Sequence, residues 1–327
     1  MTYKSKWLEP DINILDEPLF FTANTVPKKL VSAGDMIKTD FYGIDDVINA
    51  LYKKEISIVT GLNGSGKSSW LSQLALNVAN NGQIVTLFSG ELGSDRVLRW
   101  LQLQAAGKTH TVPTSNEYLF FVQDDIKAQI NNWMSKKLFI YNNNYGDKVE
   151  TVLEAIEKCV EKYHSDLVIL DNLMSLDLNA LSFERLEQQK ELIMILDKFA
   201  EKMDVHIMLV AHPRKSVEFL RKTDIAGTAD LTNAADNVFI IHRVNEDFKR
   251  LSKQYFGWGK DKEIYRYDNV IEICKNRELG GQDMFAGLFY EKESKRFLNT
   301  IGEHKKYGWE NNPIIDLSEP INNPFDL

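Results

Sequence analysis

The chain has 327 residues, of which 43% are hydrophobic and 26% are charged, an ordinary mix for a globular protein. Its net charge of −8 argues against a simple basic coat for duplex DNA, although a ring or channel can concentrate positive charge locally. No apolar run approaches the roughly 20 residues of a membrane span, and no signal peptide opens the chain. Two cysteines, Cys159 and Cys274, are too few for a disulfide framework or a four-cysteine zinc site and are expected in the core. The sequence therefore predicts a cytoplasmic protein without a membrane segment.

In chain order, residues 1–40 are irregular and are interpreted as a leader or linker. Buried-type strands then alternate with helical patterns. The expected strands are 56–60, 84–90, 138–142, 166–172 and 206–212, and the expected helices are 67–81, 94–106, 148–163 and 183–203. This alternation predicts an α/β fold with a mostly parallel central sheet flanked by helices. Strands 237–243 and 269–275 and a hairpin over 285–298 add antiparallel strands at the C-terminal end.

Two segments near the end of the chain have more than one interpretation. Residues 245–268 mix basic and aromatic side chains, so they form either a solvated loop or hairpin, or a flexible arm that contacts a nucleic-acid strand through stacking and charge. Residues 302–327 are polar and close on Phe325 and Leu327, and they form either a disordered terminus or a hook for a partner protein. We therefore expect a leader over 1–40, one domain over 41–300 and a flexible tail over 301–327.

The residues GLNGSGKS, at 61–68, follow an expected strand and precede an expected helix. In this context the pattern G-x-x-x-x-G-K-[ST] predicts a phosphate-binding loop, or P-loop. Its glycines let backbone N–H groups face the phosphates, and the helix N-terminus adds positive potential. Lys67 is expected to reach the β- and γ-phosphates, and Ser68 to bind Mg²⁺. The residues expected to contact the nucleotide here are Gly61, Asn63, Gly64, Ser65, Gly66, Lys67, Ser68 and Ser69.

Three further polar residues stand where expected strands end, which is the ligand edge of a parallel sheet. Asp171 ends the run LVIL and is expected to hold Mg²⁺, directly or through water; the alternative is a helix-capping or turn aspartate. Glu91 is positioned to polarise an attacking water, or else it is an acid near the start of the following helix. His212 either senses the γ-phosphate or is an ordinary residue at a strand end.

The stretch CKNRELGG, at 274–281, places Lys275 and Arg277 at the end of another expected strand, just before two glycines. A basic pair in this position is typical of an anion-binding site. The P-loop lies some two hundred residues earlier, so the phosphate that this pair would meet is not evident from its position. On local grounds alone, a surface pair that ends an edge strand is an equally good interpretation.

Six segments together resemble the ordered motifs of DnaB-type replicative helicases, nearest the branch of the phage primase-helicases and mitochondrial Twinkle. They are GLNGSGKSS, the SGE at 89–91, VILDN at 168–172, VAHPRK at 210–215, DIAGTADLTNAADNVFIIHR at 224–243, and CKNRELGG. The resemblance covers roughly residues 40–300. It implies a RecA-like fold and an enzyme that uses ATP, or another NTP or dNTP, with Mg²⁺. The protein would be the motor of a ring, expected to be hexameric, that unwinds DNA while moving along a single strand.

The resemblance also implies a role for each matching residue. Lys67, Ser68, Glu91 and Asp171 would act within their own subunit, with Glu91 as catalytic base and His212 as γ-phosphate sensor. Lys275 and Arg277 would enter the nucleotide site of the neighbouring subunit, so that hydrolysis depends on assembly. Arg243 and Tyr290 would sandwich the base. The residues expected to contact single-stranded DNA are Arg214, Lys215, Gly227, Thr228 and Ala229.

The sequence departs from this family in carrying only about 40 residues before the expected ATPase domain, with no cysteine-rich or acidic primase-like cluster. Priming activity is therefore not expected. A replication partner at the C-terminal tail is the alternative to a disordered terminus. Such a protein belongs in the cytoplasm of a bacterial or phage-infected cell. Two other functions share the P-loop fold: a recombinase-like filament ATPase or loader that binds DNA without unwinding, and a regulatory, clock-type ATPase with no role on DNA.

Overall fold

The computed structural model describes residues 21–26, 32–179, 181, 185–213, 218–225, 229–278, 280 and 283–311. Its centre is a nine-stranded sheet in the order β13-β12-β11-β10-β3-β9-β8-β4-β7. The strands are β3 (Ile56–Gly61), β4 (Val85–Ser89), β7 (Leu138–Ile140), β8 (Leu167–Asp171), β9 (His206–Val210), β10 (Asn237–Arg243), β11 (Asn269–Asn276), β12 (Met284–Glu291) and β13 (Arg296–Leu298). Neighbouring strands pair in parallel in the part of the sheet that runs β10-β3-β9-β8-β4-β7. They pair antiparallel in the part that runs β13-β12-β11-β10. The predicted sheet is confirmed.

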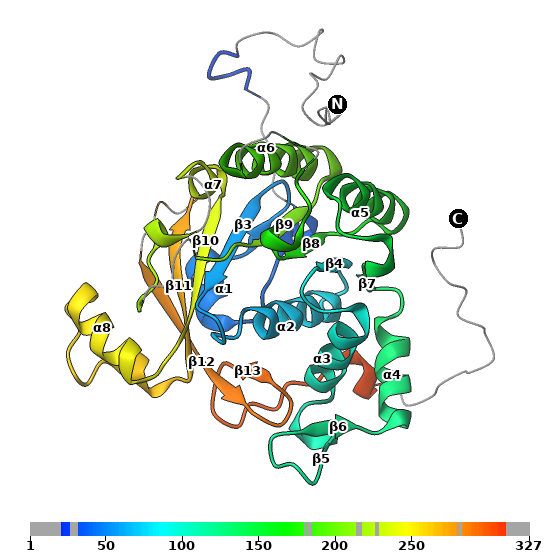
Figure 1. Cartoon of the computed structure of the whole chain (residues 1–327), viewed down its shortest axis with the longest axis vertical. Helices are drawn as coiled ribbons and strands as arrows, with labels where there is room; N and C mark the ends of the chain where they lie inside the picture. Colours follow the sequence, from blue (N-terminus) through cyan, green and yellow to red (C-terminus); the bar gives the residue numbers. More distant parts are fainter. Residues whose placement is uncertain are drawn as a thin grey trace.

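Helices cover both faces of the sheet (Figure 1). They are α1 (Tyr42–Ile48), α2 (Lys67–Asn80), α3 (Ser94–Ala106), α4 (Asp124–Met134), α5 (Val149–Tyr163), α6 (Arg185–Met203), α7 (Ala229–Ala234) and α8 (Glu246–Phe256). Alternate side chains of β3 point to opposite faces. Val59 packs with α1 to α4, while Ile56 and Ile58 pack with α5 to α7. The sheet is thus buried on both sides, which explains why its central strands are apolar throughout.

Two short strand pairs lie outside the main sheet, and several elements were not expected from the sequence. Strand β1 (Met36–Ile37) pairs with β2 (Leu51–Tyr52), and β5 (Thr111–Pro113) pairs with β6 (Phe120–Val122). Helices α1, α4 and α7 were likewise not predicted. Helices α1 and α7 have only 7 and 6 residues, so the repeat of their apolar positions is too brief to separate them from loops.

The segment 245–268 contains a helix, so the expectation of a loop, hairpin or flexible arm is wrong. Asn245 accepts a hydrogen bond from the Phe248 backbone N–H and caps α8, and Gly257 ends the helix in the left-handed conformation. The aromatic side chains that looked like stacking groups mostly form a small core with Phe219, which precedes α7. That core contains Phe248, Leu251 and Val270, with Phe256, Trp258, Tyr265 and Phe285 packed against it.

The packed chain extends beyond residue 300, past the boundary that the sequence had placed there. Tyr307 is fully buried and donates its hydroxyl to Asn77 Oδ1 at 2.8 Å. Trp309 is also buried, and its ring N–H donates to the Ala105 carbonyl. Aromatic side chains of this size stabilise a fold mainly through the area they bury, so Tyr307 and Trp309 belong to the core rather than to the tail.

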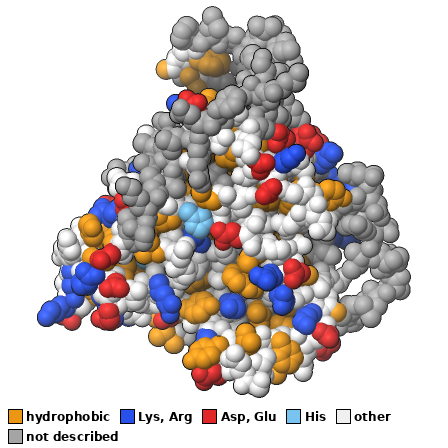
Figure 2. Space-filling model, viewed as in Figure 1, with side chains coloured by type: hydrophobic (Ala, Val, Ile, Leu, Met, Phe, Trp, Pro, Cys, Tyr) orange, Lys and Arg blue, Asp and Glu red, His pale blue; other side chains and the backbone are white. Residues whose placement is uncertain are grey.

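Two expectations drawn from composition can be compared with the fold. The thiols of Cys159 and Cys274 are both free and buried, as expected. Among the residues that the structure describes, no helix has the length and apolar character needed to cross a membrane. On the face shown in Figure 2, basic, acidic and hydrophobic side chains are interspersed.

Candidate nucleotide-binding site

The P-loop runs from the end of β3 to the start of α2, as its sequence predicts. Gly64 and Gly66 have positive φ values of 75° and 98°, which glycine adopts without strain. At Gly66 a Cβ atom would also lie 2.9 Å from Phe297 Cζ. The loop folds back on Lys67, whose Nζ donates to the carbonyls of Gly61 at 2.8 Å and Leu62 at 3.2 Å. The lysine is therefore held where a phosphate can replace these carbonyls.

The close approach at Gly66 leads to a prediction with a matched control. Gly66→Ala should weaken nucleotide binding, because relieving the strain and the contact with Phe297 must displace the loop. Gly82→Ala also places a side chain on a residue with a positive φ, 88°, but the added Cβ atom would have open space around it. Both variants should lose about 1 kcal/mol of stability, and only Gly66→Ala should lose nucleotide affinity in equilibrium titration. Equal affinities in the two variants would contradict this account.

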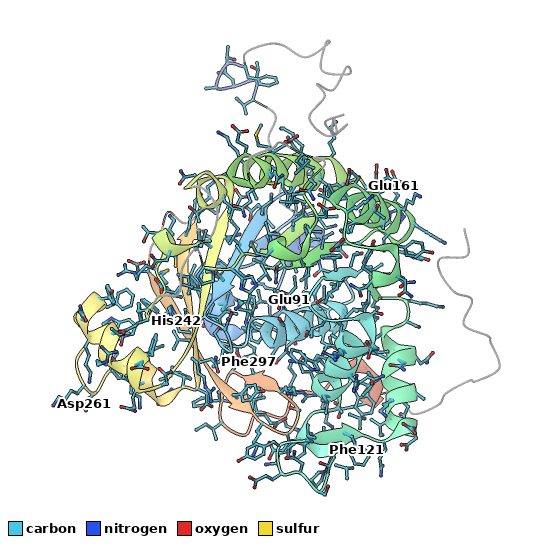
Figure 3. The ribbon with its side chains drawn as sticks, in the orientation of Figure 1. Glu91, Phe121, Glu161, His242, Asp261 and Phe297 are labelled. Carbon is cyan, nitrogen blue, oxygen red and sulfur yellow. The ribbon has the colours of Figure 1, made fainter. Side chains whose placement is uncertain are left out.

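A cavity of about 800 Å³ opens over the P-loop. It brings together the P-loop residues with polar side chains from five strand ends, and most of the residues predicted to contact nucleotide line it. They are Asn63, Gly64, Ser65, Gly66, Lys67, Ser68, Ser69, Glu91, Asp171, His212, Arg243 and Tyr290, joined by Trp100, Val244, Asp268, Asn269 and Phe297. Gly61 lies behind them at the end of β3. Figure 3 shows Glu91 and Phe297 near α2.

The phosphate end of the cavity holds a buried carboxylate beside a hydroxyl. Asp171, at the end of β8, is 7% exposed and accepts a hydrogen bond from the Ser68 side chain. Burial raises the pKa of Asp171, whereas that hydrogen bond and Lys67 lower it. Burial likewise lowers the pKa of Lys67, an effect opposed by the charges of Asp171 and Glu91. Lys67 and each carboxylate favour one another's charged forms, but burial outweighs this attraction, and the charge of Glu91 adds to the rise in the pKa of Asp171.

Glu91 and His212 are tied together by a residue that the sequence did not single out, Asn172. The Asn172 amide donates to Glu91 Oε1 and lies 2.8 Å from His212 Nε2, and His212 Nε2 is 3.1 Å from Glu91 Oε1. Glu91 follows β4, Asn172 follows β8 and His212 follows β9, so these strand ends meet as predicted. The available signal was the position of Asn172 directly after Asp171.

The other end of the cavity is aromatic. Arg243 ends β10 and Tyr290 lies near the end of β12, and the two were predicted to hold a base. Burial raises the pKa of Tyr290, and the nearby charge of Arg243 opposes that shift. The Tyr290 ring lies 5.4 Å from that of Phe297, and Trp100 of α3 also faces the cavity, beneath Lys295. Arg243 and Tyr290 are therefore brought together, and Trp100 and Phe297 are additions from tertiary packing.

Lys275 and Arg277 lie at the opposite edge of the sheet. Strand β11 runs antiparallel to β10, so Asn276 pairs with Asn237, which in turn pairs with Ser57 near the start of β3. Four residue steps along β3, from Ser57 to Gly61, separate that edge from the P-loop, a distance of about 13 Å. In this subunit neither basic residue lines the cavity.

The basic pair instead covers the C-terminal end of α7. Lys275 Nζ donates to the carbonyls of Thr232 and Asn233, and Arg277 donates to those of Asn233 and Ala234. Arg277 also pairs with Asp236 at 2.8 Å. Cations are favoured at the carbonyl end of a helix. The Arg277 side chain is 56% exposed and remains accessible to another molecule.

Glu55, at the same edge, gives the fold a pH dependence. Burial and the charge of Asp236 raise the pKa of Glu55 from 4.5 to about 7, although Asn237 donates a hydrogen bond to it. Below pH 4.5 both folded and unfolded chains keep the proton. Between pH 4.5 and 7 the unfolded chain releases it first, so up to about 3 kcal/mol of stability is lost as the pH rises.

Glu55→Gln should remove this loss, because glutamine can still accept the hydrogen bond from Asn237 and carries no charge. In urea unfolding the variant should be more stable than the parent at pH 8, with a difference much smaller at pH 4.5. An equal difference at both pH values would show that charge is not the cause.

Five residues were predicted to contact DNA. Arg214, Lys215, Gly227 and Thr228 lie outside the described residues, and Ala229 is the first residue of α7.

Comparison with known proteins identifies relatives of this arrangement. A model of the AAA_25 family, described as an AAA domain, matches residues 27–218. DnaB replicative helicase of Mycoplasma pneumoniae is 24% identical over 254 residues, covering 72% of this chain and 50% of that protein. DnaB of Helicobacter pylori is 23% identical, with coverages of 86% and 63%. A chloroplastic/mitochondrial Twinkle homologue of Arabidopsis thaliana is 21% identical, with coverages of 64% and 31%. The chain thus spans little more than half the length of these DnaB relatives.

Solved structures support the fold. One of them, a separate ATPase domain, superposes with a TM-score of 0.63 and 20% identity, covering 82% of this chain and 93% of that one. A DnaB-like replicative helicase, studied with its interactions with primase, has a TM-score of 0.63 and 17% identity, with coverages of 82% and 64%. These likenesses confirm the predicted RecA-like fold. Because the family model matches more than half of its residues, the chain belongs to the AAA_25 family of AAA domains, and its relatives include replicative helicases of the DnaB and Twinkle types.

Proposed function

We propose that the chain is the motor of a ring-forming, NTP-driven DNA helicase that moves along single-stranded DNA and unwinds duplex during replication. One observation carries this proposal: the P-loop cavity lies at one edge of the sheet, and the exposed basic pair lies at the other. A subunit built in this way can offer its nucleotide to one neighbour and its arginine to the next. The relatives named above support the replicative role.

Within one subunit, the P-loop N–H groups and Lys67 bind the phosphates of ATP or another NTP or dNTP. Ser68 and Asp171 fit a Mg²⁺ ion, because their hydrogen bond already places a hydroxyl and a carboxylate oxygen together. A protein Mg²⁺ site commonly takes one or two carboxylates and completes its shell with phosphate oxygens and water. The bound ion would neutralise phosphate charge. Glu91 accepts the proton of the attacking water, and His212 contacts the γ-phosphate.

Across the interface, Arg277 of one subunit reaches the γ-phosphate held by the next, with Lys275 beside it. A positive charge there stabilises the charge that develops during phosphoryl transfer. Arg243 and Tyr290 hold the base. Hydrolysis then depends on assembly, because the cavity of a single subunit lacks this cation.

For DNA, we propose that Arg214, Lys215, Gly227, Thr228 and Ala229 face the channel of a six-membered ring. Backbone N–H groups and basic side chains contact phosphates without reading sequence, which a translocating motor requires. The C-terminal tail is proposed to bind a replication partner.

A strand-displacement assay tests the proposed function. The substrate is a forked DNA duplex with a 5′ single-stranded tail, and the matched control is Lys67→Ala. The protein should hydrolyse ATP faster with single-stranded DNA present and release the displaced strand, and the control should do neither. Hydrolysis without unwinding would favour a filament-forming ATPase or loader, and hydrolysis indifferent to DNA would favour a regulatory ATPase.

A further inference from the structure

Asn172 is 1% exposed, and its side chain lies between Glu91 and His212 at the phosphate end of the cavity. Its side-chain oxygen accepts hydrogen bonds from the backbone N–H groups of Met174 at 2.8 Å and Ser175 at 3.2 Å. Both partners are donors only, so the oxygen and nitrogen of the amide cannot be exchanged. The amide nitrogen must therefore face Glu91 and His212.

The hydrogen atoms on that nitrogen decide which residue holds Glu91. An amide has two N–H donors, one for Glu91 Oε1 and one for His212 Nε2. His212 then accepts at Nε2 and carries its own proton on Nδ1. The same Nε2 cannot also donate to Glu91, although the two atoms are 3.1 Å apart. The donor that fixes Glu91 is therefore Asn172 and not His212.

We propose that Asn172 is a positioning residue that links Glu91 to His212. This inference rests on the proposed function, in which Glu91 is the base and His212 contacts the γ-phosphate. Asn172 does not line the cavity, so it acts through its two partners. When His212 moves toward a terminal phosphate, the Asn172 amide moves with it and shifts Glu91. The base is therefore aligned when the phosphate is present.

Two substitutions separate the donor from the oxygen that holds the turn. Asn172→Asp keeps an oxygen for the N–H groups of Met174 and Ser175 and replaces the donor with an acceptor. Asn172→Ser keeps a capping oxygen without charge and is too short to reach Glu91. In both, kcat for ATP hydrolysis should fall about 10- to 100-fold, the scale expected for a misplaced catalytic group. The dissociation constant of a non-hydrolysable ATP analogue should stay close to the parent value in both variants. The melting temperature should stay close to the parent value in Asn172→Ser, whereas the buried carboxylate of Asn172→Asp beside Glu91 should lower it.

Combining Asn172→Ser with His212→Ala tests the link itself. Because His212 influences Glu91 only through Asn172, part of the His212→Ala loss should be absent once Asn172 is serine, so the double variant should lose clearly less activity than the product of the two single losses. Multiplying losses would overturn the link. Parent-like kcat in both Asn172 variants, or a fall in kcat of Asn172→Ser matched by lost nucleotide affinity and melting temperature, would overturn the positioning role.

Glu91→Gln, measured in the same assay, separates this inference from the proposed function. A parent protein without hydrolysis, or a Glu91→Gln variant with the parent rate, would refute the proposed function whatever Asn172 does. An inactive Glu91→Gln variant beside fully active Asn172 variants would refute only the role of Asn172.

Discussion

Arg277→Ala should reduce ATP hydrolysis by the assembled protein about 10³- to 10⁵-fold, the effect typical of removing an arginine supplied in trans. The side chain is far from its own P-loop and half exposed, so its loss should leave nucleotide binding by the same subunit intact. Steady-state hydrolysis, together with titration of a non-hydrolysable analogue, measures the two effects separately.

The control is Arg266→Ala, which removes another exposed arginine, one that pairs with Glu263 and does not line the cavity. It should retain the parent rate. Arg277→Ala also leaves Asp236 without its ion-pair partner, which can lower the stability of the fold. The melting temperature of the variant is therefore measured, to separate a loss of stability from a loss of catalysis. Full hydrolysis by Arg277→Ala subunits would refute a role in trans.

Glu91→Gln should lower kcat about 10²- to 10⁴-fold, the usual contribution of a general base. The glutamine keeps the shape of the side chain and can still accept the hydrogen bond from Asn172. The P-loop contacts of Lys67 are unchanged, so nucleotide affinity should persist. Single-turnover hydrolysis with a preformed protein–nucleotide complex isolates the chemical step.

Glu187→Gln is the matched control, because Glu187 is exposed on α6, which packs on the other face of the sheet from α2. It should hydrolyse ATP at the parent rate. If Glu91→Gln did the same, the base would have to be sought elsewhere in the cavity.

Local patterns explain which parts of the site could be predicted. The glycine spacing at 61–68 stands between a predicted strand and a predicted helix, which is the context that identifies a P-loop, and the structure has both elements. Asp171, Glu91 and His212 end parallel strands, and parallel strands deliver their ends to a single edge. The antiparallel direction of β11 likewise explains why Arg277 lies at the other edge.

Contacts between distant parts of the chain account for what could not be predicted. Asn172 meets Glu91, 81 residues earlier, and only the fold reveals that its donor faces that carboxylate. Trp100 enters the cavity because α3 packs beside α2. The aromatic residues near α8 looked exposed because their partner, Phe219, lies before the previous strand in the sequence. In the fold, Phe219 stacks on His242 and Phe248.

Mixing two inactive variants tests the shared site most directly. Lys67→Ala subunits lack a working P-loop but carry Arg277, and Arg277→Ala subunits have the reverse defect. In a randomly mixed assembly at equal amounts, about a quarter of the interfaces would join an intact P-loop to an intact arginine. Hydrolysis should therefore rise well above that of either variant alone, toward a quarter of the parent rate. A mixture no more active than its components, in assemblies shown by light scattering to contain both, would contradict hydrolysis at subunit interfaces.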